Sequence, residues 1–159
     1  MKISVISGPN LDRLGSREPA IYGTATLDDV HRAVSEAAER VGASVECMQS
    51  NHEGELCSAI GRARDDGFDG LVLNAGAYTH TSIALYDAIR AGGVPTVEVH
   101  LSNPDAREAF RRRSRIAPAC VGRVAGFGPQ SYVLGLLGLI HHIRGRGAPS
   151  EKQPDAAGG

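Results

Sequence analysis

The chain of 159 residues carries 17 lysines and arginines against 18 aspartates and glutamates, a formal net charge of −1 at pH 7. This length predicts one domain with a single core, and the balanced charge argues against a nucleic-acid-binding protein. Three widely spaced cysteines without a CxxC pair indicate neither a disulfide framework nor a thiolate metal site. No leader peptide or apolar run of about 20 residues is present, so we expect a soluble cytoplasmic protein with no membrane partner.

Short runs of β-branched residues alternate with longer stretches of helical periodicity. Thr26, followed three residues later by Asp29, is typical of a capping box at a helix N-terminus. The predicted strands are residues 2–7, 44–50, 70–75, 95–101 and 120–127. The predicted helices are residues 26–42, 53–67 and 81–93, a fourth beginning at residue 102, and a last one around 131–143.

Strands that alternate with helices predict a doubly wound α/β fold, in which helices cover both faces of a parallel sheet. We expect this single domain to cover residues 1–144. Residues 145–159 are poor in large apolar side chains and are predicted to form a disordered tail. In an open parallel sheet, ligands bind beyond the carboxyl ends of the strands, near the point where the strand order reverses.

Polar side chains follow the predicted strands at that same edge. They are Asn10, Asn74, His80, His100 and Ser102. Because the carboxyl ends of parallel strands meet at one edge, these residues predict a polar site for a small molecule.

Glu98 and His100 lie two residues apart in one predicted strand, so their side chains share a face of the sheet. The pair is compatible with a structural contact, or with a carboxylate that orients an imidazole for proton transfer. A metal site on His52, His80 and His100 is not expected, because no two of them stand at helical ligand spacing and no thiolate is near.

An arginine run occupies the fourth predicted helix. Arg107 and Arg111 are four residues apart, so on a helix one or both can lean toward an anionic or hydroxylated ligand at the strand ends. Arg112, Arg113 and Arg115 are explained adequately as a solvated face.

Two other doubly wound classes are disfavoured by the residues at the strand ends. A phosphoacceptor receiver domain would need an acidic cluster after the first strand, an aspartate ending the third and a lysine ending the fifth. Residues 8–10 are Gly-Pro-Asn, Asn74 lies at the end of the third strand and Gly126-Phe127 end the fifth. Neither GxGxxG nor GxxxxGK[ST] occurs, which argues against nucleotide binding.

Five motifs together resemble type II 3-dehydroquinate dehydratase across residues 2–140. They are GPNLDRLGSREPAIYG (8–23), QSNHEGEL (49–56), LNAGAYTHTSIAL (73–85), EVHLSNPDAREAFRRRS (98–114) and GFGPQSYVLGL (126–136). The resemblance implies a flavodoxin-like fold, a five-stranded parallel sheet in three α/β/α layers, and a homododecamer built as a tetramer of trimers. It also implies the reversible anti elimination of water from 3-dehydroquinate through an enolate, in the shikimate pathway or in quinate breakdown, without metal or cofactor.

The resemblance also implies roles for individual residues. The catalytic set is Tyr22 as base, Arg17 as the cation that favours its phenolate, His100 as general acid, Glu98 as its orienting partner, and Asn10 as the holder of a water at the enolate. The substrate-binding set is Asn74 with the backbone amides of Leu101 and Ser102 at the carboxylate, and His80, Asp87 and Arg111 at the ring hydroxyls.

Two physical arguments support the enolate route over an imine. The lysines are Lys2, at the start of the first strand, and Lys152, in the predicted tail, so neither is placed to form a Schiff base. Ionising a phenol near neutral pH costs about 4 kcal/mol, and one cation about 4 Å away supplies a similar amount at an effective dielectric of about 20. The alternative is a non-catalytic module that binds a polyhydroxy acid on the same fold.

Overall fold

The computed structural model describes residues 1–16 and 24–147 of the chain. Its centre is a five-stranded parallel sheet with the strand order β2-β1-β3-β4-β5. The strands are β1 (Lys2–Ser7), β2 (Ser44–Gln49), β3 (Gly70–Asn74), β4 (Thr96–His100) and β5 (Gly122–Ala125). The strand order reverses between β1 and β3, so the carboxyl ends of these two strands flank the crevice that this topology creates.

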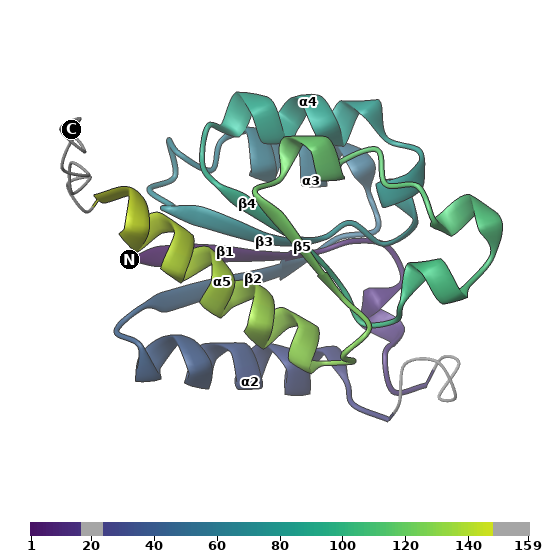
Figure 1. Ribbon diagram of the computed structural model, residues 1–159, viewed down its shortest axis with the longest axis horizontal. Coiled ribbons are helices and arrows are strands. Elements are labelled where there is room, and N and C mark those ends of the chain that lie inside the picture. The colour runs from purple at the N-terminus through teal and green to yellow at the C-terminus, as the bar shows by residue number, and fades with distance from the viewer. Residues whose placement is uncertain (17–23, 148–159) are drawn as a thin grey trace, which may run out of the picture.

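Helices cover both faces of the sheet, as Figure 1 shows, with α3 and α4 on one side and α2 and α5 on the other. They are α2 (Leu27–Arg40), α3 (Glu53–Gly61), α4 (Ile83–Gly92) and α5 (Gln130–Gly147). The short 3-10 turns are η1 (Leu11–Arg13), η2 (Gly76–His80), η3 (Pro104–Ala106), η4 (Ala109–Arg111) and η5 (Ala117–Ala119). No helix in the described ranges is long and apolar enough to cross a membrane.

Two apolar clusters form the core, one on each face of the sheet. Alternate residues of one strand join different clusters, so Val5 packs toward α2 and α5 while Ile6 packs toward α3 and α4. Strands β1, β3 and β4 are almost wholly buried, as expected for the middle of a parallel sheet covered on both faces. The rigid centre of the sheet therefore ends, at its carboxyl edge, in the polar residues described below.

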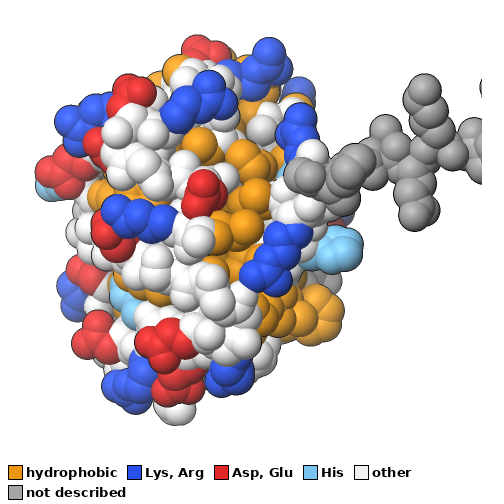
Figure 2. Space-filling view, turned by 90° about the vertical axis from the view of Figure 1, so that its left-hand side faces the viewer, with side chains coloured by type: hydrophobic (Ala, Val, Ile, Leu, Met, Phe, Trp, Pro, Cys, Tyr) orange, Lys and Arg blue, Asp and Glu red, His pale blue; other side chains and the backbone are white. Residues whose placement is uncertain are grey.

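Acidic and basic side chains are mixed on the face that Figure 2 shows. This face is the left side of Figure 1, where β1 begins, so it lies at the amino ends of the strands. Side chains of both signs surround a strip of apolar ones there, and neither sign dominates.

The predicted fold class and strands are confirmed, with strand boundaries within two residues. The capping box is also present, because Asp29 N–H donates to Thr26 Oγ1 at 3.2 Å and Thr26 N–H donates back to Asp29 Oδ2 at 2.9 Å. Helix α5 continues to Gly147, and residues 148–159 lie outside the described residues, so the predicted tail stays a prediction.

Two predicted helices are wrong in extent or type. The helix predicted over 53–67 ends at Gly61, and tight turns up to Gly67 bring the chain back to β3. The helix predicted from residue 102 is replaced by η3 and η4, because Arg107 and Glu108 between them are extended. The backbone that follows pairs with η2 instead, since Arg115 N–H donates to Thr79 C=O at 2.8 Å.

Helix α5 approaches β4 closely at Gly135, which is buried. A Cβ atom on Gly135 would lie 2.4 Å from Val99 Cγ1, too close for two carbon atoms. We therefore expect Gly135→Ala to destabilise the fold by about 1–3 kcal/mol through overpacking. Gly138, one turn later on the exposed side of the same helix, has no atom within 4 Å of the corresponding position.

The matched control is Gly138→Ala, which should raise stability by about 0.5–1 kcal/mol because alanine favours helix. Urea denaturation followed by circular dichroism measures both variants. Equal midpoints for the two variants would contradict the close contact between α5 and β4.

Candidate active site

A cavity opens at the carboxyl ends of β1, β3 and β4. Its lining combines polar and cationic side chains with a few apolar ones: Pro9, Asn10, Leu11, Leu14, Asn74, Gly76, Ala77, His80, His100, Leu101, Ser102, Pro104, Arg107 and Arg111. Two lining residues are arginines and none of those described is acidic, so the charge of the wall suits an anionic ligand.

The structure brings together most of the residues predicted from the sequence. Asn10, Asn74, His80, His100, Leu101, Ser102 and Arg111 line the cavity. Glu98 lies directly behind His100, whereas Asp87 is exposed on α4 and is not part of the lining. Arg17 and Tyr22 lie outside the described residues.

Asn10 has an unusual backbone conformation, with φ 65° and ψ 3°. It is the one non-glycine residue with a positive φ in residues 1–16 and 24–147. Asparagine tolerates this left-handed region better than most residues. Asn51 holds the turn by accepting from Asn10 N–H at 2.8 Å through its Oδ1 atom. The loop after β2 therefore fixes the residue after β1 that reaches the cavity.

Asn74 ends β3 and is almost fully buried. Its Oδ1 accepts a hydrogen bond from Gly76 N–H at 3.1 Å, which leaves the amide NH2 group for other partners. Tyr132 on α5 also contacts this side chain, and its hydroxyl lies 3.0 Å from Ser7 Oγ. Burial raises the pKa of Tyr132 to about 12, so its hydroxyl stays neutral. Sequence reasoning missed Tyr132 as a support of the site, although it lies in the last of the five motifs.

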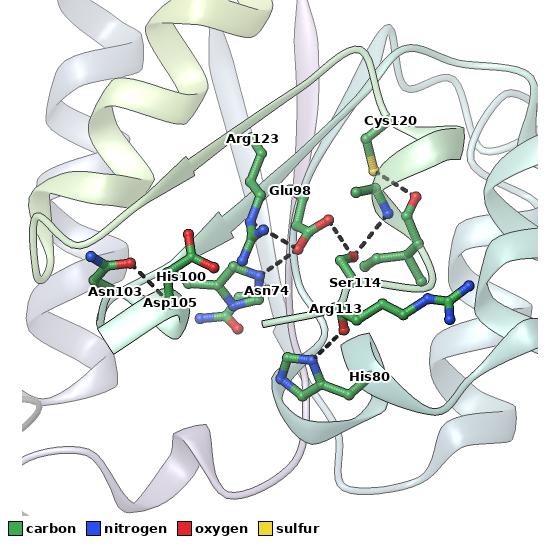
Figure 3. Close-up of polar contacts among 12 residues, drawn as sticks. Asn74, His80, Glu98, His100, Asn103, Asp105, Arg113, Ser114, Cys120 and Arg123 are labelled. Carbon is green, nitrogen blue, oxygen red and sulfur yellow. Dashed lines mark hydrogen bonds and ion pairs between the residues drawn. The ribbon is translucent and has the colours of Figure 1, made fainter. Parts of the chain in front are cut away.

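Glu98 is fully buried and holds His100 through a 2.5 Å contact between Oε1 and Nε2 (Figure 3). Ser114 Oγ donates to the other oxygen, Oε2, at 2.8 Å, and Arg123 Nε lies 3.4 Å from Oε1. Burial alone would raise the pKa of Glu98, but the hydrogen bond and charge of His100, with Ser114 and Arg123, hold the pKa below its usual value.

The ionised carboxylate determines which nitrogen of His100 carries a proton. A carboxylate can only accept hydrogen bonds, so the proton on Nε2 belongs to the imidazole. Nδ1 is then the nitrogen left for the cavity that His100 lines. When Nδ1 also carries a proton, the ring can donate it to a ligand while Glu98 stabilises the resulting charge distribution.

His80 presents a second imidazole to the cavity. Its Nδ1 donates to Arg113 C=O, with a separation of 2.9 Å. Burial lowers the pKa of His80, and the nearby charges of His100 and Arg111 add to this effect, which favours the neutral ring near neutral pH. The neutral ring then offers Nε2 as a hydrogen-bond acceptor.

Arg107 and Arg111 line the cavity although the helix predicted to present them does not form. Arg107 Nη1 lies 3.4 Å from Ser102 Oγ, and Arg111 Nε lies 2.9 Å from Glu108 Oε2. The turns η3 and η4, rather than a continuous helix, thus bring Arg107 and Arg111 to the cavity.

The site can hold an anion, donate a proton from His100 and support amide contacts at the strand ends. No three His, Cys, Asp or Glu side chains within the described ranges are grouped as a metal site would require. The sequence prediction missed Ser114, Arg123 and Tyr132, because their roles depend on packing between distant segments.

The structure is that of a doubly wound α/β protein with a cavity suited to a small anionic molecule at the carboxyl edge of its sheet. The family model described as Dehydroquinase class II matches residues 1–140, and the chain belongs to this family.

Relatives and solved structures agree with this assignment. A 3-dehydroquinate dehydratase from Jannaschia sp. is 54% identical over 149 residues, which covers 94% of this chain and all of that protein. One from Geotalea daltonii is 53% identical over 144 residues, covering 91% of this chain and 99% of the relative. The crystal structure of type II dehydroquinase from Butyrivibrio crossotus superposes with a TM-score of 0.85 at 42% identity, covering 88% of this chain and 97% of that one.

Proposed function

We propose that the chain is a 3-dehydroquinate dehydratase that eliminates water from 3-dehydroquinate to give 3-dehydroshikimate, reversibly and through an enolate. The observation that carries the proposal is the position of the His100 imidazole, which buried Glu98 holds at the cavity. Among the described residues, the cavity lining includes two arginines and no acidic side chain. Membership of the class II dehydroquinase family supports the same activity. This reaction is a step of the shikimate pathway.

His100 acts as the general acid for the leaving hydroxyl. The C–O bond breaks as Nδ1 gives its proton to the departing oxygen, and water leaves. Glu98 stabilises the imidazolium before transfer and keeps the proton on Nε2 throughout, so the ring does not need to turn. This pre-organisation is what makes a positioned acid effective.

The remaining polar groups bind the substrate and the developing enolate. We assign Asn10 to hold a water against the enolate oxygen, in keeping with its fixed position at the cavity. The amide of Asn74 and the backbone amides of Leu101 and Ser102 bind the substrate carboxylate. His80 and Arg111 take the ring hydroxyls, for which the neutral imidazole and the guanidinium are an acceptor and a donor.

Tyr22 is proposed as the base that removes the carbon-bound proton, with Arg17 as the cation that favours its phenolate. Two observations on flanking residues support a position near the cavity. Leu14 lines the cavity, and a Cβ atom on Gly15 would lie 3.0 Å from Thr24 C=O. The two segments that flank residues 17–23 therefore lie close to each other, and the first of them lies at the cavity.

An absorbance assay with 3-dehydroquinate tests the activity, because the product is a conjugated enone that absorbs in the ultraviolet. We expect absorbance to rise with time in proportion to enzyme concentration. Isothermal titration with the same compound provides the comparison. Binding without any absorbance change would favour the non-catalytic module for polyhydroxy acids.

Replacement of Tyr22 by phenylalanine tests the base. Because the phenyl ring cannot accept a proton, kcat should fall by about 10²- to 10⁴-fold while KM stays within a few-fold. Tyr86→Phe on α4 is the matched control, since Tyr86 does not line the cavity, and it should leave kcat unchanged. A near-normal kcat for Tyr22→Phe would defeat the assignment.

We also propose that the enzyme is a cytoplasmic homododecamer, a tetramer of trimers, and that Asp87 serves a neighbouring subunit. Asp87 is exposed on α4 and away from its own cavity lining, so a second copy of the chain is the way for it to meet a substrate.

Mixing two impaired variants tests this arrangement. Asp87→Asn and His100→Asn chains, unfolded and reassembled together, should regain activity in up to about a quarter of the sites, because a site needs one intact residue from each of two subunits. The same variants refolded separately are the control, and light scattering measures assembly. No gain on mixing, or a fully active monomer, would contradict the proposal.

A further inference from the structure

We propose that Arg123 is a positioning residue for the reaction: by sharing the Glu98 carboxylate with His100, its guanidinium promotes release of the proton that His100 delivers. The inference rests on the proposed role of His100 as general acid. None of the five sequence motifs includes Arg123, and it does not line the cavity, so it would act through Glu98.

The sheet register sets Arg123 beside Glu98. Strands β4 and β5 are parallel, and Glu98 pairs with Arg123, so both side chains leave the same face of the sheet. Arg123 Nε approaches Glu98 Oε1 at 3.4 Å, the same oxygen that contacts His100 Nε2 at 2.5 Å. Figure 3 shows the guanidinium and the imidazole meeting the carboxylate together. One oxygen therefore faces two cations whenever His100 is protonated.

The contact differs from the usual structural ion pair of an arginine. A structural pair commonly uses two guanidinium N–H groups on two carboxylate oxygens. Here Ser114 occupies the second oxygen, and within the described ranges the buried Nε and Nη2 atoms of Arg123 have no hydrogen-bond partner. Burying part of a cation is costly unless an anion compensates it, and Glu98 is the acid in contact with the partly buried guanidinium of Arg123. The interaction is thus mainly one of charge.

The charges around His100 come from every element that packs against the site. Glu98 is the anion, on the same strand, while His80 on η2 and Cys120 after η5 are neutral near pH 7, because burial lowers the pKa of His80 and raises that of Cys120 to about 12. The cations are Arg107, Arg111 and Arg123. Glu108 lies near Arg107 and Arg111 at 3.7 and 2.9 Å, so it partly balances those two. Arg123 depends on Glu98, which also serves the imidazole.

This sharing has a direct chemical consequence. A carboxylate that faces only an imidazolium stabilises the charged ring fully and so holds its proton strongly. A second cation on the same oxygen weakens that hold, because like charges repel and the anion is divided between them. The acid then gives up its proton to the leaving hydroxyl more readily. Loss of Arg123 should slow this transfer and keep the acid protonated to higher pH.

The test is the pH profile of kcat for Arg123→Gln and Arg123→Met, both of which remove the charge. We expect the alkaline limb to move to higher pH by about one to three units, which spans the effect of one charge about 4 Å away from full screening by water to an effective dielectric of about 20. kcat on the plateau should fall, with KM within about twofold. Arg123→Lys keeps the positive charge, so the alkaline limb of its kcat profile should lie close to that of the natural chain.

Arg90→Gln is the control for loss of a positive charge at an exposed site, on α4, and should leave the profile unchanged. Methionine matches the arginine stem without a buried polar group, so Arg123→Met keeps the test open if Arg123→Gln does not fold. The inference would be overturned if the pH profile of kcat for a neutral variant coincided with the natural one. It would also be overturned if kcat were lowered by the same factor at every pH, with no movement of the alkaline limb.

His100→Asn separates this inference from the proposed function. If that variant loses turnover while the neutral Arg123 variants keep the natural pH profile, the inference about Arg123 alone fails. If His100→Asn retains turnover, the general-acid assignment itself is wrong.

Discussion

The buried carboxylate of Glu98 is the constraint on which the active-site end of the sheet depends. An ionised group with no exposure to solvent needs several hydrogen-bond donors or cations around it, and each partner here comes from a different part of the chain. His100 shares its strand, Ser114 follows η4, and Arg123 lies on β5. Ser114 Oγ also accepts from Ala117 N–H at 2.9 Å, so the carboxylate orders the segment that leads into η5.

The parallel sheet explains why the other groups converge on the same edge. Asn10, Asn74 and His100 follow or end three adjacent strands, and backbone contacts fix the loops between them. Gly8 lets two of these loops meet, since a Cβ atom there would lie 2.6 Å from Ala75 C=O. Positive charge from the turns after β4 faces the cavity, whereas the anion lies behind the imidazole. This arrangement suits an anionic substrate and a protonated acid in the same site.

Sequence patterns predicted what depends on local periodicity. The strands, the shared face of Glu98 and His100, and the polar edge follow from alternation along one segment, and the structure confirms them. The helix from residue 102 was wrong because Asn103 caps only a short turn, its side chain accepting from Asp105 N–H at 3.1 Å. Arg123 could not be found, since its partner is set by the register between two strands far apart in sequence. The role proposed for Asp87 involves a second copy, which no pattern along one chain reveals.

The proposed acid of the reaction lies in the buried interior of the sheet. His100 ends a buried central strand, and its Nε2 is fixed by an anion that is itself fixed by two further segments, so Nδ1 faces the cavity without reorganisation. Such rigidity has a cost, because a fully paired carboxylate would hold the imidazolium proton too firmly for an efficient acid. A shared cation resolves this conflict: Arg123 keeps Glu98 ionised and in place while limiting how strongly it retains the proton. Geometry and proton affinity can then be set by different residues on neighbouring strands.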